Sequence, residues 1–385
     1  MVSRTESGAI ASWFWTVDRT LLFSFIILIL LGFMLSFSAS PSVAERIGLE
    51  SFHFVKRFAI FMVPAIIGIV AISFLNARLV RRSAILLMMG ALLLMVLTLF
   101  IGGEVKGSRR WISIAGFTMQ PSEFMKPAFV IVCAWLFSER TRHPEIPGNL
   151  FAIILFGIVA ALLVAQPDLG QTMLLTAVWG AMFFMAGMPW VWITALGILG
   201  MIGFAAAYSI FPHVAGRIDR FLTGEGDTFQ VDTAREAIIR GDWFGRGPGE
   251  GTIKRILPDS HTDFIFSVAA EEFGIIFCIV LVAIFAFVVL KSLLHAAREE
   301  DEFTKLAIAG LALLVGAQSM INIGVNLELL PAKGMTLPFI SYGGSSMLAI
   351  SITVGYLLAL TRHRPEKRAR NNVRLSRPGK HSAVV

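Results

Sequence analysis

Long apolar runs recur along almost the whole chain, and they constrain its fold more than any other feature. A helix that crosses the hydrocarbon core of a bilayer needs about 20 mostly apolar residues. Ten runs of roughly that length lie between positions 21 and 360. Because 56% of the residues are hydrophobic and only 15% are charged, a soluble globule of this sequence lacks the polar groups to cover its surface. The sequence therefore predicts an all-α, polytopic integral membrane protein and excludes a soluble enzyme.

The apolar runs also divide the chain into three parts. The ten predicted spans cover residues 21–40, 55–75, 83–102, 123–137, 150–165, 171–187, 190–211, 264–294, 304–326 and 340–360. We predict an N-terminal segment (1–20), one transmembrane domain (21–361) and a C-terminal tail (362–385). The first run is longer than the apolar core of a signal peptide, so we expect an uncleaved span.

Basic residues in short loops give the predicted orientation, because such loops stay on the cytoplasmic side. With the N-terminus inside, the internal loops hold Arg78, Arg81, Arg82, Arg140, Arg142, Lys291, Arg298 and Lys305. An even number of spans then places both termini in the cytoplasm. The tail has eight Lys or Arg residues and one acid, which accounts for the whole net charge of +7. We interpret it as a disordered extension attracted to anionic membrane lipid, and nothing else favours nucleic-acid binding.

Two predicted external segments carry basic residues against this charge rule. The first, 103–120, has Lys106, Arg109 and Arg110 with Glu104 as its only acid. The second is a large loop at about 212–262, between spans seven and eight, which is long enough to escape the rule. Basic residues at the outer face indicate an anionic ligand there. The alternative is that neighbouring topogenic signals override them.

Asp263 stands where the second external loop gives way to the eighth apolar run. A carboxylate at that boundary is partly desolvated yet reachable by substrate, and desolvation makes it a better base near neutral pH. The alternative is a helix cap, since Thr262 and Asp263 are both favoured at helix N-termini. His261 is either a second candidate base or a residue that shapes the loop.

Other polar residues lie within apolar runs or at their ends. Glu271 and Glu272 are functional or are paired with a basic neighbour. Glu123 and Lys126 are three residues apart and share a helix face, where they form a structural ion pair or leave Lys126 to meet a phosphate. The glycine-rich segment 244–251 lacks the lysine of a P-loop and is interpreted as a tight, flexible loop, with phosphate binding as the alternative.

Several separate blocks together resemble the SEDS family of bacterial cell-wall polymerases (shape, elongation, division, sporulation) over almost the full length. The blocks are 106–112 (Lys-Gly-Ser-Arg-Arg-Trp-Ile) with 120–123 (Gln-Pro-Ser-Glu), 166–170 (Gln-Pro-Asp-Leu-Gly), 257–266 (Leu-Pro-Asp-Ser-His-Thr-Asp-Phe-Ile-Phe) and 330–346. Residues 18–22, 54–57 and 332–334 resemble the cell-division branch in particular. Two departures are visible: Thr233-Ala234 replaces a common Gln-Ser, and Glu328 replaces a common Gly.

This resemblance implies a peptidoglycan glycosyltransferase of the bacterial cytoplasmic membrane. It would polymerise a lipid-linked disaccharide, lipid II, at the outer face during septal cell-wall synthesis. Asp263 matches the aspartate of the family's His-Thr-Asp-Phe motif, which implies that it is the catalytic residue. We expect the pyrophosphate groups of the substrates to be bound by Lys106, Arg110, Lys126 and Lys333, with Glu123 orienting Lys126.

The resemblance also implies protein partners: a class B penicillin-binding protein that crosslinks the new glycan, and other division proteins. Participation of Mg²⁺ or Mn²⁺ is left open, because the sequence shows no closed ligand set. The rival class is a transporter, such as a lipid II flippase. The chain lacks the repeated halves of many transporters, and its polar residues gather on one face. A third class, a purely structural scaffold, would not require Asp263.

Overall fold

Helices make up nearly all of the secondary structure in the computed structural model, which describes residues 8–105, 108–114, 117–210, 215–216, 219, 223, 228–331 and 334–362. The α-helices are α1 Ala9–Thr16, α2 Arg19–Arg46, α3 His53–Ser73, α4 Ala77–Ile101, α5 Pro121–Arg142, α6 Gly148–Ala165, α7 Leu169–Met185, α8 Trp190–Ile210, α10 Phe229–Gly241, α11 Ile265–Ala297, α12 Glu302–Asn326 and α13 Gly344–Thr361. A short 3₁₀ helix, η1, covers Ile253–Arg255. The antiparallel strands β1 Gly103–Val105, β2 Ser108–Ile114 and β3 Phe117–Met119 were not predicted.

The helices confirm the prediction of an α-helical, multi-pass membrane protein. Every predicted span falls on a helix, namely α2 to α8 and α11 to α13. Within the described part of the chain, seven helices are long and apolar enough to cross a membrane. The other three are α5, which contains several charged residues, α7, which has 17 residues, and α8. The total of ten spans therefore stays a prediction.

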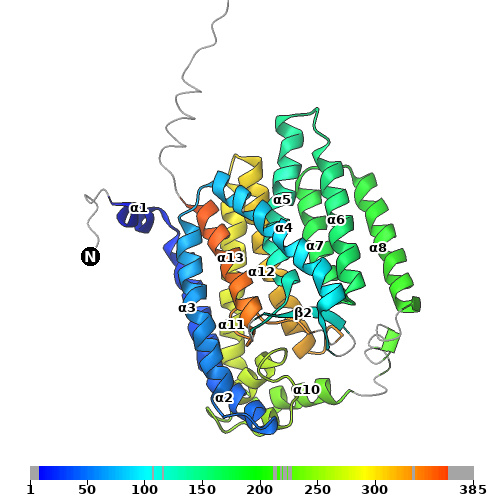
Figure 1. Ribbon diagram of the computed structural model, residues 1–385. Coiled ribbons are helices and arrows are strands. Elements are labelled where there is room, and N and C mark those ends of the chain that lie inside the picture. The colour runs from blue at the N-terminus through cyan, green and yellow to red at the C-terminus, as the bar shows by residue number, and fades with distance from the viewer. Residues whose placement is uncertain are drawn as a thin grey trace, which may run out of the picture.

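The long helices run side by side in one bundle (Figure 1), with α1 and the end of α13 at the upper end and the strands and α10 at the lower end. The closest neighbours are α3 with α13, α4 with α5, and α11 with α12. In α13 and α12, 83% and 67% of the most apolar window is buried, against 22% in α3 and α6. The two buried helices form the centre, and the outer helices present apolar side chains to lipid.

Asp18 connects two helices at the upper end of the bundle. Its carboxylate caps α2 by accepting the N–H of Leu21 (3.0 Å), and it contacts Lys291 Nζ and His295 Nε2 of α11 at 2.8 Å each. Burial raises the pKa of Asp18, but the hydrogen bonds from His295 and Lys291 outweigh burial and hold that pKa below its usual range. The charged residues before the first span thus fix the start of α2 against α11.

The helix α11 is interrupted at Gly274, whose φ of 82° and ψ of 174° are not helical. An interruption leaves peptide groups without partners inside the helix, which is costly at membrane depth. Here the loop after α10 supplies them: Arg246 N to Glu271 O (2.9 Å), Gly247 N to Glu272 O (3.0 Å), Ile275 N to Asp242 O (2.9 Å) and Ile276 N to Trp243 O (3.3 Å). The second external segment is thereby held against the start of α11.

Glycines allow this close approach of loop and helix. A Cβ atom on Gly274 would lie 2.3 Å from the carbonyl oxygen of Trp243, and one on Gly245 would lie 2.2 Å from that of Glu272. Both glycines also have positive φ, which side chains disfavour. The glycine-rich segment is therefore a tight loop, as predicted, and its role is to pack on the break in α11.

Glu271 and Glu272, the two acids beside this break, have structural partners. The carboxylate of Glu271 accepts the N–H groups of Thr252 (2.7 Å), Ile253 (2.7 Å) and Lys254 (3.0 Å). Glu272 forms a buried ion pair with Lys254 Nζ. The contact of Glu272 matches pairing with a basic neighbour, the structural alternative, whereas Glu271 is held by backbone N–H groups.

Replacing Gly274 by alanine should destabilise the protein, because the new methyl group would overlap Trp243 and the backbone has positive φ. We expect Gly274→Ala to lose about 1–3 kcal/mol of unfolding free energy, seen as a lower thermal midpoint by tryptophan fluorescence in detergent. Gly157→Ala is the matched control, since a Cβ there meets nothing within 4 Å. Equal midpoints for both variants would contradict this account of the break.

Candidate active site

Asp263 lies in the turn that leads into α11, at the lower end of the bundle in Figure 1, and its side chain is half-buried. The N-cap residue of α11 is Phe264, whose side chain makes no capping hydrogen bond. Asp263 directly precedes this N-cap residue, and its role as a base or as a helix-terminal residue stays a prediction. A Cβ on Gly334 would lie 3.3 Å from Asp263 Oδ2, so the segment before α13 passes directly beside this carboxylate.

Two asparagines of α12 donate hydrogen bonds to the Asp263 turn. The carbonyl oxygen of Asp263 accepts from Asn322 Nδ2 and from Asn326 Nδ2, both at 2.9 Å. Asn326 Oδ1 in turn accepts from Oγ (2.7 Å) and N (3.1 Å) of Ser267 in α11, and Asn322 Nδ2 also donates to the carbonyl of Met335 (2.6 Å). The two amides join α11, α12 and the segment before α13 at one point.

Sequence reasoning missed these two residues, although a signal was present. Gln318, Asn322 and Asn326 recur every fourth position in an otherwise apolar run, which puts them on one helix face. All three are at most 1% exposed. A polar stripe of this kind inside a membrane helix predicts that something polar packs against it.

His261 is buried in an aromatic cluster two residues before Asp263. Its ring lies 4.5 Å from that of Phe54 and 5.5 Å from that of Tyr342, and its carbonyl accepts the N–H of Tyr342 (2.9 Å). Burial lowers the pKa of His261 to about 4, against an opposing effect of Asp259. The imidazole is therefore neutral at physiological pH, and its packing favours the interpretation that it shapes the loop.

Arg110 lies on β2 and forms an ion pair with Asp168, between Nη1 and Oδ2 at 3.2 Å. Gln120 Nε2 donates to the same oxygen at 3.0 Å, and Asp168 also caps α7. The Arg110 side chain is 23% exposed, whereas Asp168 is 5% exposed. A buried acid thus anchors a basic group that stays partly accessible to solvent at this end of the bundle.

Glu123 and Lys126 form the buried ion pair that their spacing allows, with Nζ 2.9 Å from the carboxylate. Lys126 also donates to Gln318 Oε1 (2.9 Å), and Glu123 accepts from Gln171 Nε2 (2.6 Å). Gln318 Nε2 continues to the carbonyl of Thr336 at 3.0 Å. The network connects α5, α7, α12 and the segment before α13. These contacts match the structural alternative, and a substrate-binding role of the pair stays a prediction.

Two residues from the predicted binding set, Lys106 and Lys333, lie outside the described residues. The described Gly334 follows Lys333 in the chain and lies beside Asp263. Among the residues that the structure describes, no three His, Cys, Asp or Glu side chains gather closely enough to hold a metal ion. Participation of Mg²⁺ or Mn²⁺ stays open, and we derive no step through a divalent cation.

Known proteins share this architecture and sequence. The family model described as "Cell cycle protein", which comprises FtsW, RodA and SpoVE, matches residues 18–366. The chain belongs to this family. The resemblance seen in the sequence blocks is thereby confirmed for the SEDS proteins as a family.

Individual members of the family extend the comparison. "Probable peptidoglycan glycosyltransferase FtsW" of Caulobacter vibrioides is 49% identical over 365 residues, or 94% of each chain. A solved chain from "Structural coordination of polymerization and crosslinking by a peptidoglycan synthase complex" has a TM-score of 0.74 and 25% identity, and the match covers 90% of this chain and 97% of that one. The rod shape determining protein RodA of Thermus thermophilus shares the fold, with a TM-score of 0.66 and 24% identity over 90% and 96% of the chains.

The two departures from the SEDS pattern lie close together in the structure. Glu328 has a φ of 57°, in the left-handed region, which explains why many members have glycine there. Its Oε2 lies 3.8 Å from Nη1 of Arg235, the α10 residue that follows the buried Thr233 and Ala234. The Arg235–Glu328 contact thus joins α10, which contains Thr233 and Ala234, to the end of α12, where Glu328 lies.

Loss of one asparagine amide should loosen the Asp263 turn. In Asn326→Leu, the carbonyl of Asp263 keeps the donor from Asn322 and loses the one from Asn326, so we expect roughly tenfold faster amide hydrogen exchange in residues 262–268. Hydrogen–deuterium exchange read by mass spectrometry measures this. Ser319→Ala is the matched control on α12, because Ser319 bonds within its own helix, to the carbonyl of Val315. Unchanged exchange in Asn326→Leu would show that the amide does not hold the turn.

Proposed function

We propose that this protein is the peptidoglycan glycosyltransferase of septal cell-wall synthesis, which polymerises lipid II at the outer face of the bacterial cytoplasmic membrane. The main support is the position of Asp263, a half-buried carboxylate at the end of the bundle that the charge rule assigns to the outside. The Caulobacter relative with the same proposed activity is similar over 94% of the chain. We therefore assign Asp263 as the catalytic residue.

In the proposed reaction, Asp263 acts as a general base. A sugar hydroxyl of the acceptor lipid II attacks the anomeric carbon of the growing strand, and Asp263 takes the hydroxyl proton. A new glycosidic C–O bond forms as the bond from the anomeric carbon to the pyrophosphate oxygen breaks, with inversion at carbon. Undecaprenyl pyrophosphate leaves as an anion, so the reaction does not need the second, acidic carboxyl group that a glycosidase uses to protonate its leaving group.

The pyrophosphate groups require positive charge near Asp263. Arg110 suits this role, because Asp168 fixes its guanidinium while 23% of the side chain stays exposed. Lys333 precedes Gly334, which passes beside the Asp263 carboxylate, and Lys106 is close to Arg110 in sequence. We assign these three residues to direct contact. For the buried Glu123 and Lys126, we propose that their network positions the segment that contains Gly334.

Asp263→Asn should remove the base while keeping the size of the side chain. We expect glycan synthesis from lipid II by the purified protein with its partner to fall by about 10² to 10⁴-fold. Asp259→Asn is the matched control in the same loop, since asparagine tolerates its φ of 53°. Near-normal glycan chains from Asp263→Asn would contradict the assignment. In vesicles with lipid II added from outside, lipid movement across the bilayer without glycan synthesis would identify a flippase instead.

We also propose a class B penicillin-binding protein as the partner, within the assembly of division proteins at the septum. The similar chain from a complex of polymerization and crosslinking supports this pairing. The position of Asp263 gives a reason for such a partner, because this residue lies on a turn beside external segments. Small displacements of a catalytic group cost large factors in rate. A partner that contacts these segments and α11 and α12 would hold the turn in place.

Activation by the partner should be visible in the rate of chain synthesis. We expect the co-purified pair to synthesise glycan at least about tenfold faster than the protein alone at equal concentration. Inactivating the crosslinking site of the partner provides the control, because it removes transpeptidation and keeps the contact. Equal rates with and without the partner would leave the partner a crosslinking role only.

A further inference from the structure

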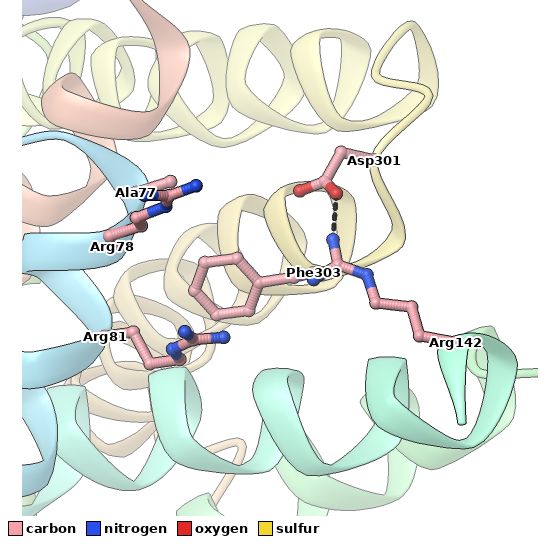
Figure 2. Close-up of a pocket in the computed structure, with 6 residues that line it drawn as sticks. All are labelled: Ala77, Arg78, Arg81, Arg142, Asp301 and Phe303. Carbon is pink, nitrogen blue, oxygen red and sulfur yellow. Dashed lines mark hydrogen bonds and ion pairs between the residues drawn. The ribbon is translucent and has the colours of Figure 1, made fainter. Parts of the chain in front are cut away.

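A basic pocket lies at the opposite end of the bundle from Asp263, where α4 and α12 begin and α5 ends (Figure 2). Its volume is about 260 Å³, and it is lined by Ala77, Arg78, Arg81, Arg142, Asp301 and Phe303. The proposed glycosyl transfer does not use it. The positive-inside rule assigns this end to the cytoplasm.

The charges around the pocket are unbalanced. Figure 2 shows the guanidinium groups of Arg78, Arg81 and Arg142 arranged around the ring of Phe303, with Asp301 paired to Arg142. Asp301 also caps α12 through the N–H (3.1 Å) and hydroxyl (2.6 Å) of Thr304, so its carboxylate is already shared. Among the described residues, neither Arg78 nor Arg81 has an ion-pair partner. Two arginines therefore present uncompensated charge to the pocket.

The surroundings place the pocket at the level of lipid head groups. The guanidinium of Arg81 lies 5.2 Å from the ring centre of Trp135, whose Nε1 donates to Glu139 at 2.7 Å. Tryptophan with an apolar ring and a bonded N–H is typical of the membrane–water interface. The volume is also below the roughly 300 Å³ at which sites for whole small molecules begin, so it suits a single anionic head group.

We propose that this pocket binds the phosphate group of an anionic phospholipid from the cytoplasmic leaflet. Arginine guanidinium groups match phosphate oxygens in geometry and charge, and basic pockets between membrane helices are a recognised type of lipid head-group site. The lipid would bridge α4 to α5 and α12. The competing explanation is that Arg78 and Arg81 serve only to orient the chain, a role that other arginines of the same loops share.

The experiment titrates the detergent-solubilised full chain with dioleoyl phosphatidylglycerol and counts bound lipid by native mass spectrometry. Each basic residue near anionic lipid contributes roughly a fivefold factor, so Arg78→Gln/Arg81→Gln should weaken binding roughly 10- to 30-fold. The control, Arg82→Gln/Arg140→Gln, removes two exposed arginines outside the lining and should stay within about twofold. Should the double variant fail to fold, the single variant Arg78→Gln takes its place, because Arg78 is exposed. We expect its affinity for phosphatidylglycerol to fall roughly fivefold.

Two further arms identify the ligand. Phosphatidylcholine, which has no net charge, should bind the wild type and both double variants equally. Millimolar inorganic phosphate should leave the thermal midpoint of the wild type unchanged. Equal phosphatidylglycerol affinity in the pocket variant and the control would overturn the proposal. Stabilisation of the wild type alone by inorganic phosphate, without a difference in lipid affinity, would overturn the lipid assignment in favour of a soluble phosphate.

Discussion

The position of Asp263 depends on how one buried carbonyl group obtains its hydrogen bonds. The backbone of the turn before α11 cannot bond within a helix, and water does not reach the buried faces of Asn322 and Asn326. Those two amides supply the donors at 2.9 Å each, from a helix whose other buried residues are mostly apolar. Because both asparagines also bond to other segments, the turn, α11 and the approach to α13 share one anchor.

The same requirement for backbone partners explains the external loop after α10. At Gly274 the helix α11 opens, and loop residues donate to or accept from the freed peptide groups. Glu271 then binds the backbone N–H groups of residues 252–254, and Glu272 binds the side chain of Lys254. Part of a loop that looked flexible from its glycines is thus fixed to the helix whose first residues follow Asp263, which limits how far the Asp263 turn moves.

Charged residues in this bundle fall into two groups with different surroundings. Glu123 with Lys126, within α5, and Glu272 of α11 with Lys254 of η1 are buried pairs, and breaking such a pair leaves an uncompensated charge. Arg110 at one end and Arg78 at the other keep access to solvent. The accessible cations suit phosphate-containing ligands, namely the substrate pyrophosphate outside and a lipid head group inside.

The sequence by itself determined the membrane helices and the family, and it put Glu123 and Lys126 on one helix face, because apolar run length, motifs and helical spacing are local properties of the chain. It did not predict the three strands, the break at Gly274 or the ion pair of Arg110 with Asp168, 58 positions apart by residue number. Those features depend on which distant residues meet, so only the tertiary structure decided them. At Gly274, the loop after α10 supplies partners for backbone groups that a bilayer leaves without water, and Asp168 at the start of α7 meets Arg110 of β2.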